Sequence, residues 1–458
     1  MAAPFLKYNV INVDIKLPKS VSEILQKFDK EGYEIYIVGG AVRDALMGRP
    51  VNDWDFATNA IPEQILKVIP GGLYNNKFGT VFTNNPDDPE RPHEITTFRR
   101  EEGYSDARHP DKVTWGKTLE EDLSRRDFTI NALALDKNFK IIDFFGGQKD
   151  INDKLIRAVR DPDERFLEDA LRMMRAVRIA AEIGFTVEVK TFEAIKKHAA
   201  QINKIAKERV KDELFKLLAS TNPYEGMILF RTSGLMQEIL PELEKCFGVE
   251  QKSPGRHHIY DVGTHLLMAL KECKSPDPVT RLATLIHDIG KPQTYKKLKT
   301  GTITFYNHEM VSTRIAENIA DRLRLSKKEK EKFITLVRWH QFTVDERQTD
   351  KAIRRFLKNV GLENVKEMLA LRVADRLGGG ARETSWRLEE FKKRLVEVQK
   401  EPFSIRDLKI NGNDVMKELK LKPGPKIGEI LNSLFKEVEE KNLENDRKSL
   451  LSKLHSLN

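Results

Sequence analysis

The chain has 458 residues, of which 33% are charged and 40% hydrophobic, and its formal net charge is +9. This composition is typical of a soluble globular protein of about three domains, and the basic excess favours an anionic partner such as nucleic acid. No stretch approaches the ~20 apolar residues of a membrane span, and the N-terminal segment has no apolar signal region. With only two cysteines a disulfide framework is excluded, and we expect a cytoplasmic protein.

The first predicted elements mix strands and helices. Segment 33–40 is rich in β-branched and aromatic residues and predicts a strand that ends in two glycines, while segment 41–48 has helical spacing. Further strands are expected within 94–100 and 132–145. From about Asp163 onward the apolar residues recur at intervals of three and four, which predicts helices.

We therefore predict an α+β protein, in which a small α/β head with a mixed sheet precedes an all-α neck, body and tail. Clusters of proline, glycine and polar residues indicate where these parts meet. The expected ranges are 1–160 for the head, 161–225 for the neck, 226–400 for the body and 401–458 for the tail.

The first motif that indicates chemistry is IVGGAVRD, residues 37–44. Gly39 and Gly40 stand where a strand meets a helix, and paired glycines let backbone amides approach a phosphate. Arg43, one turn into the helix, would add a charged donor. A glycine pair is also common in turns that bind no ligand. This motif therefore indicates phosphate binding only together with the motifs that follow it in the chain.

The second motif is a pair of carboxylates, Asp53 and Asp55. On a strand these residues would point to the same face, and the repulsion between them would be relieved by a cation. Mg²⁺ prefers one or two carboxylates together with phosphate oxygens, and two ions roughly 3.5–4 Å apart suit in-line phosphoryl transfer. Glu94, in the next predicted strand, is a candidate third carboxylate.

The third motif, RRDFTIN, begins with Arg125, Arg126 and Asp127. Guanidinium groups suit the oxygens of a triphosphate, and a neighbouring carboxylate suits a ribose hydroxyl. The alternative is a cluster of charges on the surface of a helix.

The fourth motif places Asp169, Arg172 and Arg175 on one face of a predicted helix. A carboxylate accepts from the exocyclic amine of cytosine or adenine, and a guanidinium donates to the adjacent ring nitrogen. Such a pair would accept these two bases and reject uracil and guanine. An ion pair within the helix is the simpler interpretation.

The helical body carries a second candidate metal centre. An adjacent histidine and aspartate, His287 and Asp288, stand in the run LIHDIGKP, and helical segments on both sides supply further ligands. The mixed nitrogen and oxygen set suits Mn, Ni, Fe or Zn better than Mg. The full set of candidates is His265, His287, Asp288 and Asp375, with His308 and His340 for a second ion.

Taken in order, the head and neck motifs resemble the class II tRNA nucleotidyltransferase family, which comprises the CCA-adding enzymes and related poly(A) polymerases. The motifs that carry the resemblance are GGAVRD, DWD, RRDFTIN, DFFGGQKDI, EDALRMMR and ERVKDELFKLL, all between residues 39 and 218. Segment 100–113 also resembles the flexible loop that this family needs to switch from C to A addition.

The resemblance implies a role for each matching residue. It implies that Asp53 and Asp55 bind metal, that Gly40 and Arg43 contact the triphosphate, and that Arg126 and Asp127 contact the nucleotide. It also implies that Asp169 and Arg172 form an amino-acid template for CTP and ATP. The remaining candidates for nucleotide contacts are Gly39, Arg175 and Arg178.

The body resembles the HD phosphohydrolase superfamily, whose metal ligands match His265, His287, Asp288 and Asp375. Lys291 would lie near the phosphate. Some CCA-adding enzymes carry such a domain, with phosphatase or cyclic phosphodiesterase activity on RNA ends. The alternative is an inactive HD fold that holds tRNA. The tail, with its glycine-containing turns and nearby lysines, is similar to the segment of the family that contacts the RNA backbone.

The leading hypothesis is a CCA-adding tRNA nucleotidyltransferase that uses Mg²⁺, CTP and ATP and binds the acceptor stem and 3′ end of tRNA. A poly(A) polymerase of the same family is the nearest alternative. There are two further alternatives. One is a metal-dependent phosphohydrolase whose head only binds a nucleotide, and the other is a non-catalytic RNA-binding scaffold. No membrane partner is expected, and the sequence makes no prediction of the oligomeric state.

Overall fold

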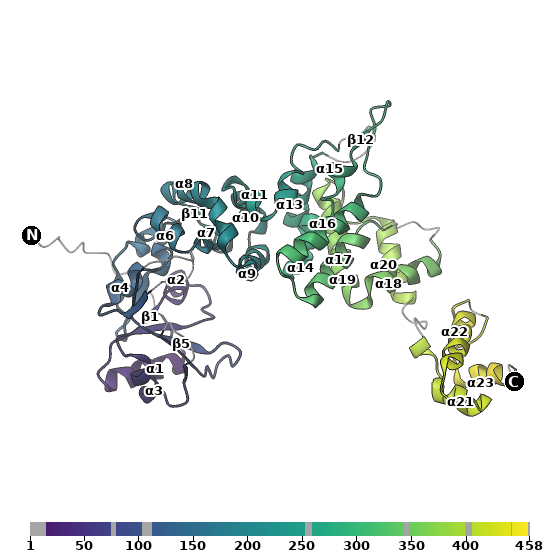
Figure 1. Ribbon diagram of the computed structural model, residues 1–458, viewed down its shortest axis with the longest axis horizontal. Helices are drawn as coiled ribbons and strands as arrows, with labels where there is room; N and C mark the ends of the chain where they lie inside the picture. Colours follow the sequence, from purple (N-terminus) through teal and green to yellow (C-terminus); the bar gives the residue numbers. More distant parts are fainter. Residues whose placement is uncertain are drawn as a thin grey trace, which may run out of the picture.

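The structure is a computed structural model that describes residues 15–74, 79–102, 112–251, 259–342, 348–398, 405–440 and 442–456. Head, neck, body and tail follow one another in space in the same order as in the chain, so the molecule is elongated (Figure 1). We use these four names for residues 15–160, 161–225, 226–398 and 405–456. No helix within the described ranges has the length and apolar character needed to cross a membrane.

The head is built on one seven-stranded sheet with the order β3-β4-β5-β2-β1-β8-β9. Strands β2 and β5 pair in parallel and the remaining neighbours are antiparallel, which confirms the predicted mixed sheet. In this order the strands are Leu73–Tyr74, Thr80–Thr83, His93–Thr97, Asp55–Thr58, Ile35–Val38, Leu133–Leu135 and Ile141–Asp143.

The apolar residues on the two faces of this sheet belong to two different hydrophobic cores. One face joins a large core that continues through the neck into the body, and the other face has a small core under α4, around Phe98 and Leu123. The head helices are α1 (Lys19–Lys30), α2 (Gly40–Leu46), α3 (Pro62–Val68), α4 (Leu119–Ser124) and α5 (Gly147–Asn152), with a short 3-10 turn, η1 (Thr129–Asn131).

The neck is mainly helical, as predicted, and the residues at its start favour the beginning of a helix. Asp161 caps α6 by accepting hydrogen bonds from two backbone amides, and Pro162 takes the first helical position, where it has no amide to leave unpaired. One short parallel pair, β10 (Leu155–Ile156) with β11 (Thr186–Val187), ties the end of the head to the neck. The other elements are α6 (Pro162–Glu168), α7 (Leu171–Ile183), α8 (Val189–His198), η2 (Ala199–Lys204) and α9 (Lys207–Ala219).

The body packs around α13, α14 and α19, which carry or directly precede ligands of the predicted centre. A short hairpin of β12 and β13 interrupts the helices and projects from the body (Figure 1). The elements are α10 (Pro223–Thr232), α11 (Leu235–Ile239), α12 (Pro241–Glu244), α13 (Val262–Glu272), α14 (Pro278–Ile286), α15 (Lys291–Thr294), β12 (Lys296–Lys297), β13 (Ile303–Thr304), α16 (His308–Arg322), α17 (Lys327–Trp339), α18 (Asp350–Val360), η3 (Leu362–Asn364), α19 (Val365–Gly378) and α20 (Trp386–Val398).

The tail has its own hydrophobic core, which includes Val415, Leu434 and Leu450 and is separate from the large core. It consists of η4 (Ile405–Asp407), α21 (Gly412–Leu419), α22 (Pro425–Glu439) and α23 (Arg447–His455). In Figure 1 it lies at the opposite end of the molecule from the head.

Candidate nucleotide site and candidate metal centre

Three carboxylates of the head lie at one end of the central strands. Asp55 begins β2 and is the register partner of Glu94 on the parallel strand β5. Asp53 lies in the segment before β2, so the expectation that both aspartates lie on a strand holds only for Asp55. Asp53 is exposed, and its Oδ1 lies 3.8 Å from Nη1 of Arg91.

The electrostatics of these carboxylates suit a divalent cation. Burial raises the pKa of Asp55; Arg126 opposes this shift and Asp53 adds to it. Burial and the nearby Asp55 also raise the pKa of Glu94. Negative charge gathered in this way is stabilised by a cation. The three carboxylates are not, however, among the clusters of the described residues whose ligand atoms all lie within 4.8 Å of one another.

The glycine pair fits closely against the RRD motif. Gly39 has a φ of 80°, in the left-handed region, and a Cβ atom there would lie 2.8 Å from Nη1 of Arg126. Glycine is therefore needed both for the backbone and for the approach of that guanidinium. In the helix that follows, Nε and Nη2 of the buried Arg43 donate to the carboxylate of Asp44, and its Nη1 donates a 2.7 Å hydrogen bond to Oδ1 of Asn131.

An ion pair joins the head to the neck. Arg175 of α7 donates to Oδ2 of Asp127 at 2.8 Å, while Oδ1 accepts from the side chain of Asn131 at 3.1 Å and from the amide of Phe128 at 2.8 Å. Burial alone would raise the pKa of Asp127, but the Arg175 guanidinium and these hydrogen bonds hold it well below its usual range. Asp127 is thus a fixed anion where the two parts meet.

A buried carboxylate that the sequence analysis did not single out holds the two arginines before Asp127. The Oδ1 of Asp122 lies 2.7 Å from Nη2 of Arg125, and its Oδ2 lies 3.5 Å from Nη2 of Arg126. The signal was present in the sequence, because Asp122 precedes these arginines by three and four positions, which is one helical turn.

The template pair is arranged differently from the prediction. Asp169 is the extended residue that ends α6, and α7 begins at Leu171, so Asp169 and Arg172 do not share one helix. Oδ2 of Asp169 accepts a 2.8 Å hydrogen bond from Arg209 of α9, and Oδ1 accepts from the amide of Leu171. Arg172 binds Glu168 and the carbonyl of Arg125 instead. Separate partners therefore hold the two side chains.

Both members of the template pair nevertheless line one cavity of about 440 Å³, together with Arg209 of α9. A second cavity of about 680 Å³ is lined by the glycine pair and by Asp53 and Asp55. The two cavities share the lining residues Arg126, Asp127, Arg175 and Lys216, and therefore adjoin each other between head and neck.

Arg178 lines the second cavity, away from the template pair. It is held by Glu182 and, through a 2.7 Å contact, by Glu213 of α9. Arg209 and Glu213 belong to the run ERVKDELFKLL, to which no role was assigned from the sequence. The predicted flexible loop, 100–113, lies mostly outside the described residues; its two ends pair as β6 (Arg99–Glu102) and β7 (Lys112–Trp115).

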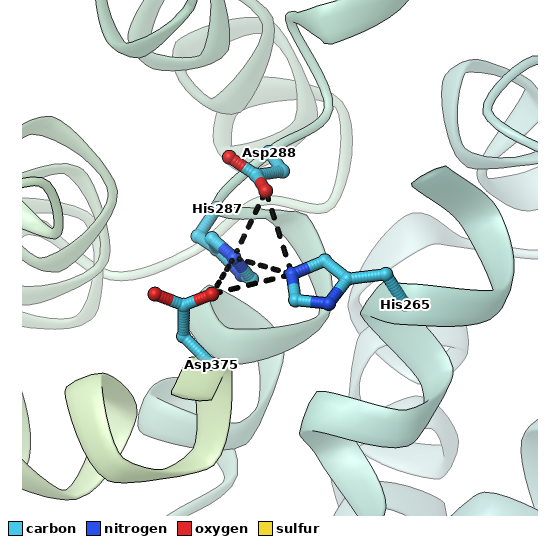
Figure 2. Close-up of side chains that lie close together, drawn as sticks. All are labelled: His265, His287, Asp288 and Asp375. Carbon is cyan, nitrogen blue, oxygen red and sulfur yellow. Dashed lines mark hydrogen bonds and ion pairs between the residues drawn. The ribbon is translucent and has the colours of Figure 1, made fainter. Parts of the chain in front are cut away.

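In the body, the four predicted ligands converge from three helices (Figure 2). His265 lies on α13, His287 and Asp288 follow α14, and Asp375 lies on α19. Nε2 of His265 is 3.3 Å from Oδ1 of Asp375 and 3.3 Å from Nε2 of His287, and Nε2 of His287 is 3.3 Å from Oδ2 of Asp288. We call these four residues the first cluster.

A second cluster consists of Asp288, His308 and His340. Oδ1 of Asp288 lies 3.0 Å from Nε2 of His308 and 3.5 Å from Nε2 of His340, whereas its Oδ2 faces the first cluster. Asp288 thus bridges both clusters. All candidates proposed from the sequence for this centre are brought together.

The donor set fits a divalent transition metal. Nδ1 of His287, His308 and His340 each lies within 2.8 Å of a backbone carbonyl, which directs the Nε2 atoms inward as ligands. Burial lowers the pKa of His287, but Asp288 and Asp375 raise it to about 10. The buried carboxylates therefore favour a positive charge at this position, which a metal ion would supply.

Comparison with known protein families covers most of the chain. Residues 35–157 match a family model described as the poly A polymerase head domain, and residues 184–247 match "Probable RNA and SrmB- binding site of polymerase A". Residues 302–454 match a model described as tRNA nucleotidyltransferase domain 2. None of these models describes an HD domain.

Curated relatives are similar over nearly their whole length. The chain is 37% identical to a CCA-adding enzyme of Ligilactobacillus salivarius, covering 96% of each chain, and 32% identical to one of Lactococcus lactis, covering 96% and 99%. Among solved structures, the Bacillus stearothermophilus CCA-adding enzyme in complex with CTP is 28% identical, with a TM-score of 0.69 over 96% of each chain. The Thermotoga maritima CCA-adding enzyme with tRNA has the same fold, with a TM-score of 0.58, at 20% identity.

Proposed function

Because the chain belongs to the family of CCA-adding enzymes and is thus a nucleotidyltransferase of tRNA processing, we propose that its head–neck cleft builds the CCA end from CTP and ATP. The observation that carries this proposal is that the two cavities adjoin each other and share lining residues. The carboxylate end and the template end share Arg126, Asp127 and Arg175, so one nucleoside triphosphate can reach both.

In this proposal the head residues position the triphosphate. Asp53 and Asp55 would hold Mg²⁺, with Glu94 nearby, and the bound ions would supply charge neutralisation for in-line attack of the RNA 3′-hydroxyl on the α-phosphate. Arg126 and Arg43 would offer donors to the phosphate oxygens. Positioning of this kind supplies most of the catalysis in phosphoryl transfer.

The neck residues would choose the base. Asp169 would accept from the exocyclic amine of C or A, and Arg172 would donate to the ring nitrogen. Arg209 binds Asp169, and Glu168 binds Arg172, which supports this proposal. With these separate partners, Asp169 and Arg172 are held in place without forming an ion pair with each other. Asp127, fixed by Arg175 and Asn131, would bind the ribose.

Transfer assays on a tRNA that ends before CCA test these assignments. Asp53→Ala and Asp55→Ala should abolish incorporation of both nucleotides. Asp169→Ala should instead retain transfer and extend it to UTP and GTP. Unchanged base choice in Asp169→Ala would remove the template assignment, and retained transfer in Asp53→Ala would remove the metal assignment.

A second function is favoured by the two clusters of the body. We propose that they bind divalent transition metals, with Mn, Ni, Fe and Zn as candidates, and hydrolyse phosphate esters at RNA ends. The bridging position of Asp288 supports two ions, and Lys291, whose Nζ lies 2.5 Å from Oδ2 of Asp288, would meet the phosphate. Asp53→Ala should keep this activity while losing transfer, whereas Asp288→Asn should do the reverse.

We also propose that the four ranges predicted from the sequence act as domains, and that the tail holds the RNA. Its separate core supports an independent unit. An A-form acceptor stem is recognised mainly through its shape and backbone, so binding should be salt-sensitive and spread over neck, body and tail. Removal of residues 401–458 should weaken tRNA binding and leave CTP binding intact.

A further inference from the structure

A cavity of about 370 Å³ opens beside the second cluster of the body. Its lining includes His308, a member of that cluster, and Lys291, which pairs with Asp288. A molecule in this cavity would therefore touch the metal centre. The volume falls within the range of about 300–1,000 Å³ that is usual for small-ligand pockets, and it is near the lower limit, which suits a single nucleotide.

The rim of this cavity presents an aromatic ring to solvent. Tyr306 is 77% exposed, and it lies between the hairpin strand β13 and the start of α16. The next residue, Asn307, has a φ of 61°, a left-handed conformation that asparagine tolerates better than most residues. This turn sends His308 into the second cluster while Tyr306 remains at the rim.

Apart from Tyr306 and Phe305, the residues that line the cavity are polar or charged. Nζ of Lys291 pairs with Oδ2 of Asp288 at 2.5 Å, donates to Oε1 of Gln251 at 2.9 Å, and lies 5.3 Å from the centre of the Phe305 ring. One acidic side chain, Glu309, also lines the cavity, and it faces Arg338 at 4.0 Å. The cavity could therefore hold an anionic group beside Lys291 and a flat group against Tyr306 at its rim.

We propose that this cavity is the substrate pocket of the body centre and that Tyr306 stacks on an unpaired nucleobase whose phosphate reaches Lys291 and His308. This inference rests on the phosphohydrolase activity proposed above and adds a residue, Tyr306, that would select a substrate with a base over one without. In the reaction the oxygen of water bonds to phosphorus, the ester P–O bond breaks, and the leaving alcohol takes the proton that water gives up. A base with one open face stacks readily on an aromatic side chain.

The test compares a nucleotide with a base-free phosphate ester. Guanosine 3′-monophosphate and glycerol 2-phosphate are both monoesters, and guanine is the base that the head template is proposed to reject. Tyr306→Ala should weaken binding of guanosine 3′-monophosphate to the metal-free full chain by about 5- to 100-fold. It should lower Mn²⁺-supported hydrolysis of that nucleotide and leave hydrolysis of glycerol 2-phosphate unchanged.

Two variants serve as controls. Tyr306→Phe keeps the ring and should behave as the wild type, and so should Trp386→Ala, which removes an aromatic that is 63% exposed elsewhere on the body. Equal nucleotide binding in the wild type and Tyr306→Ala, or an equal loss with both substrates, would overturn the stacking role. If the wild type hydrolyses neither ester while its binding still depends on Tyr306, the phosphohydrolase proposal fails and the nucleotide pocket stands.

Discussion

Arg209 of α9 donates a 2.8 Å hydrogen bond to Oδ2 of Asp169, which links a residue of one neck helix to the residue that ends another. Asp169 has no regular helix to fix its side chain, because its backbone is extended between α6 and α7. Arg209 therefore helps to set the direction of this carboxylate, which in the proposed function would accept from the base.

Arg209→Ala should reduce the preference for CTP and ATP over UTP and GTP. A hydrogen bond to a charged group contributes about 1.5–3 kcal/mol, so kcat/KM for CTP should fall about 10- to 100-fold. Nucleotide competition assays measure this change. Lys207→Ala, at a partly exposed position on the same helix, is the matched control, and the same loss of preference in both variants would contradict the role of Arg209.

The pair between Asp127 and Arg175 should stabilise the junction of head and neck in a pH-dependent way. Asp127→Asn removes the buried charge and should lower the free energy of unfolding at neutral pH by about 2 kcal/mol. Because folding depresses the pKa of Asp127, this stabilisation is present above the ordinary carboxyl pKa of about 4 and is lost as the pH falls through the lower folded-state value. Thermal or denaturant unfolding across this pH range measures the difference.

Asp29→Asn is the control for that measurement, because Asp29 pairs with Lys137 where both side chains are about half exposed. Exposed pairs contribute about 0–1 kcal/mol, so this variant should unfold like the wild type. A constant difference between wild type and Asp127→Asn at all pH values would contradict the depressed pKa.

Gly39→Ala tests the approach of Arg126 to the glycine turn. The new methyl group would meet Nη1 of Arg126 at 2.8 Å, so this guanidinium must move and KM for CTP should rise about 10-fold or more. Gly48→Ala is matched to it, because Gly48 also has a positive φ, 64°, but has no heavy atom within 4 Å of the added carbon. Both variants carry a backbone cost of about 1–2 kcal/mol. Only Gly39→Ala should change nucleotide binding.

Three variants of the body centre should lose different amounts of bound metal. His340→Ala removes a ligand of the second cluster only, Asp375→Ala removes one of the first cluster only, and Asp288→Asn weakens both. After loading with Mn²⁺ and desalting, elemental analysis should show a partial loss of the body metal in each of the first two variants and an almost complete loss in the third. Equal metal content in all three would contradict the bridging role of Asp288.

Much of this site follows from local sequence patterns. The six candidate ligands of the body converge because His287 and Asp288 are adjacent at the end of α14, and the other four lie on, or at the ends of, helices packed around it. In the head, the strand that carries Glu94 was predicted from its residue types, and Asp55 begins the strand that pairs with it in parallel, which places the two carboxylates side by side.

The parts that the sequence did not predict depend on tertiary partners. Asp169 was expected on a helix because apolar spacing continues through it, but the chain is extended there and Arg209, forty residues later, supplies the compensating hydrogen bond. Asn131 was likewise not identified as an anchor, because its partner Arg43 is 88 positions away and is brought near only by the folded sheet and its loops. The spacing of apolar residues indicates the type of a single helix or strand. It carries no information about pairs of residues that are far apart in the sequence.

CCA addition is tested by the 3′-end product formed from a defined tRNA that ends before CCA, with CTP and ATP supplied separately and together. CTP alone should extend the tRNA by the cytidines and stop, ATP alone should add nothing to this end, and both together should complete CCA without further growth. Failure to incorporate CTP, or a long tail grown from ATP alone, would contradict CCA addition and support a poly(A) polymerase.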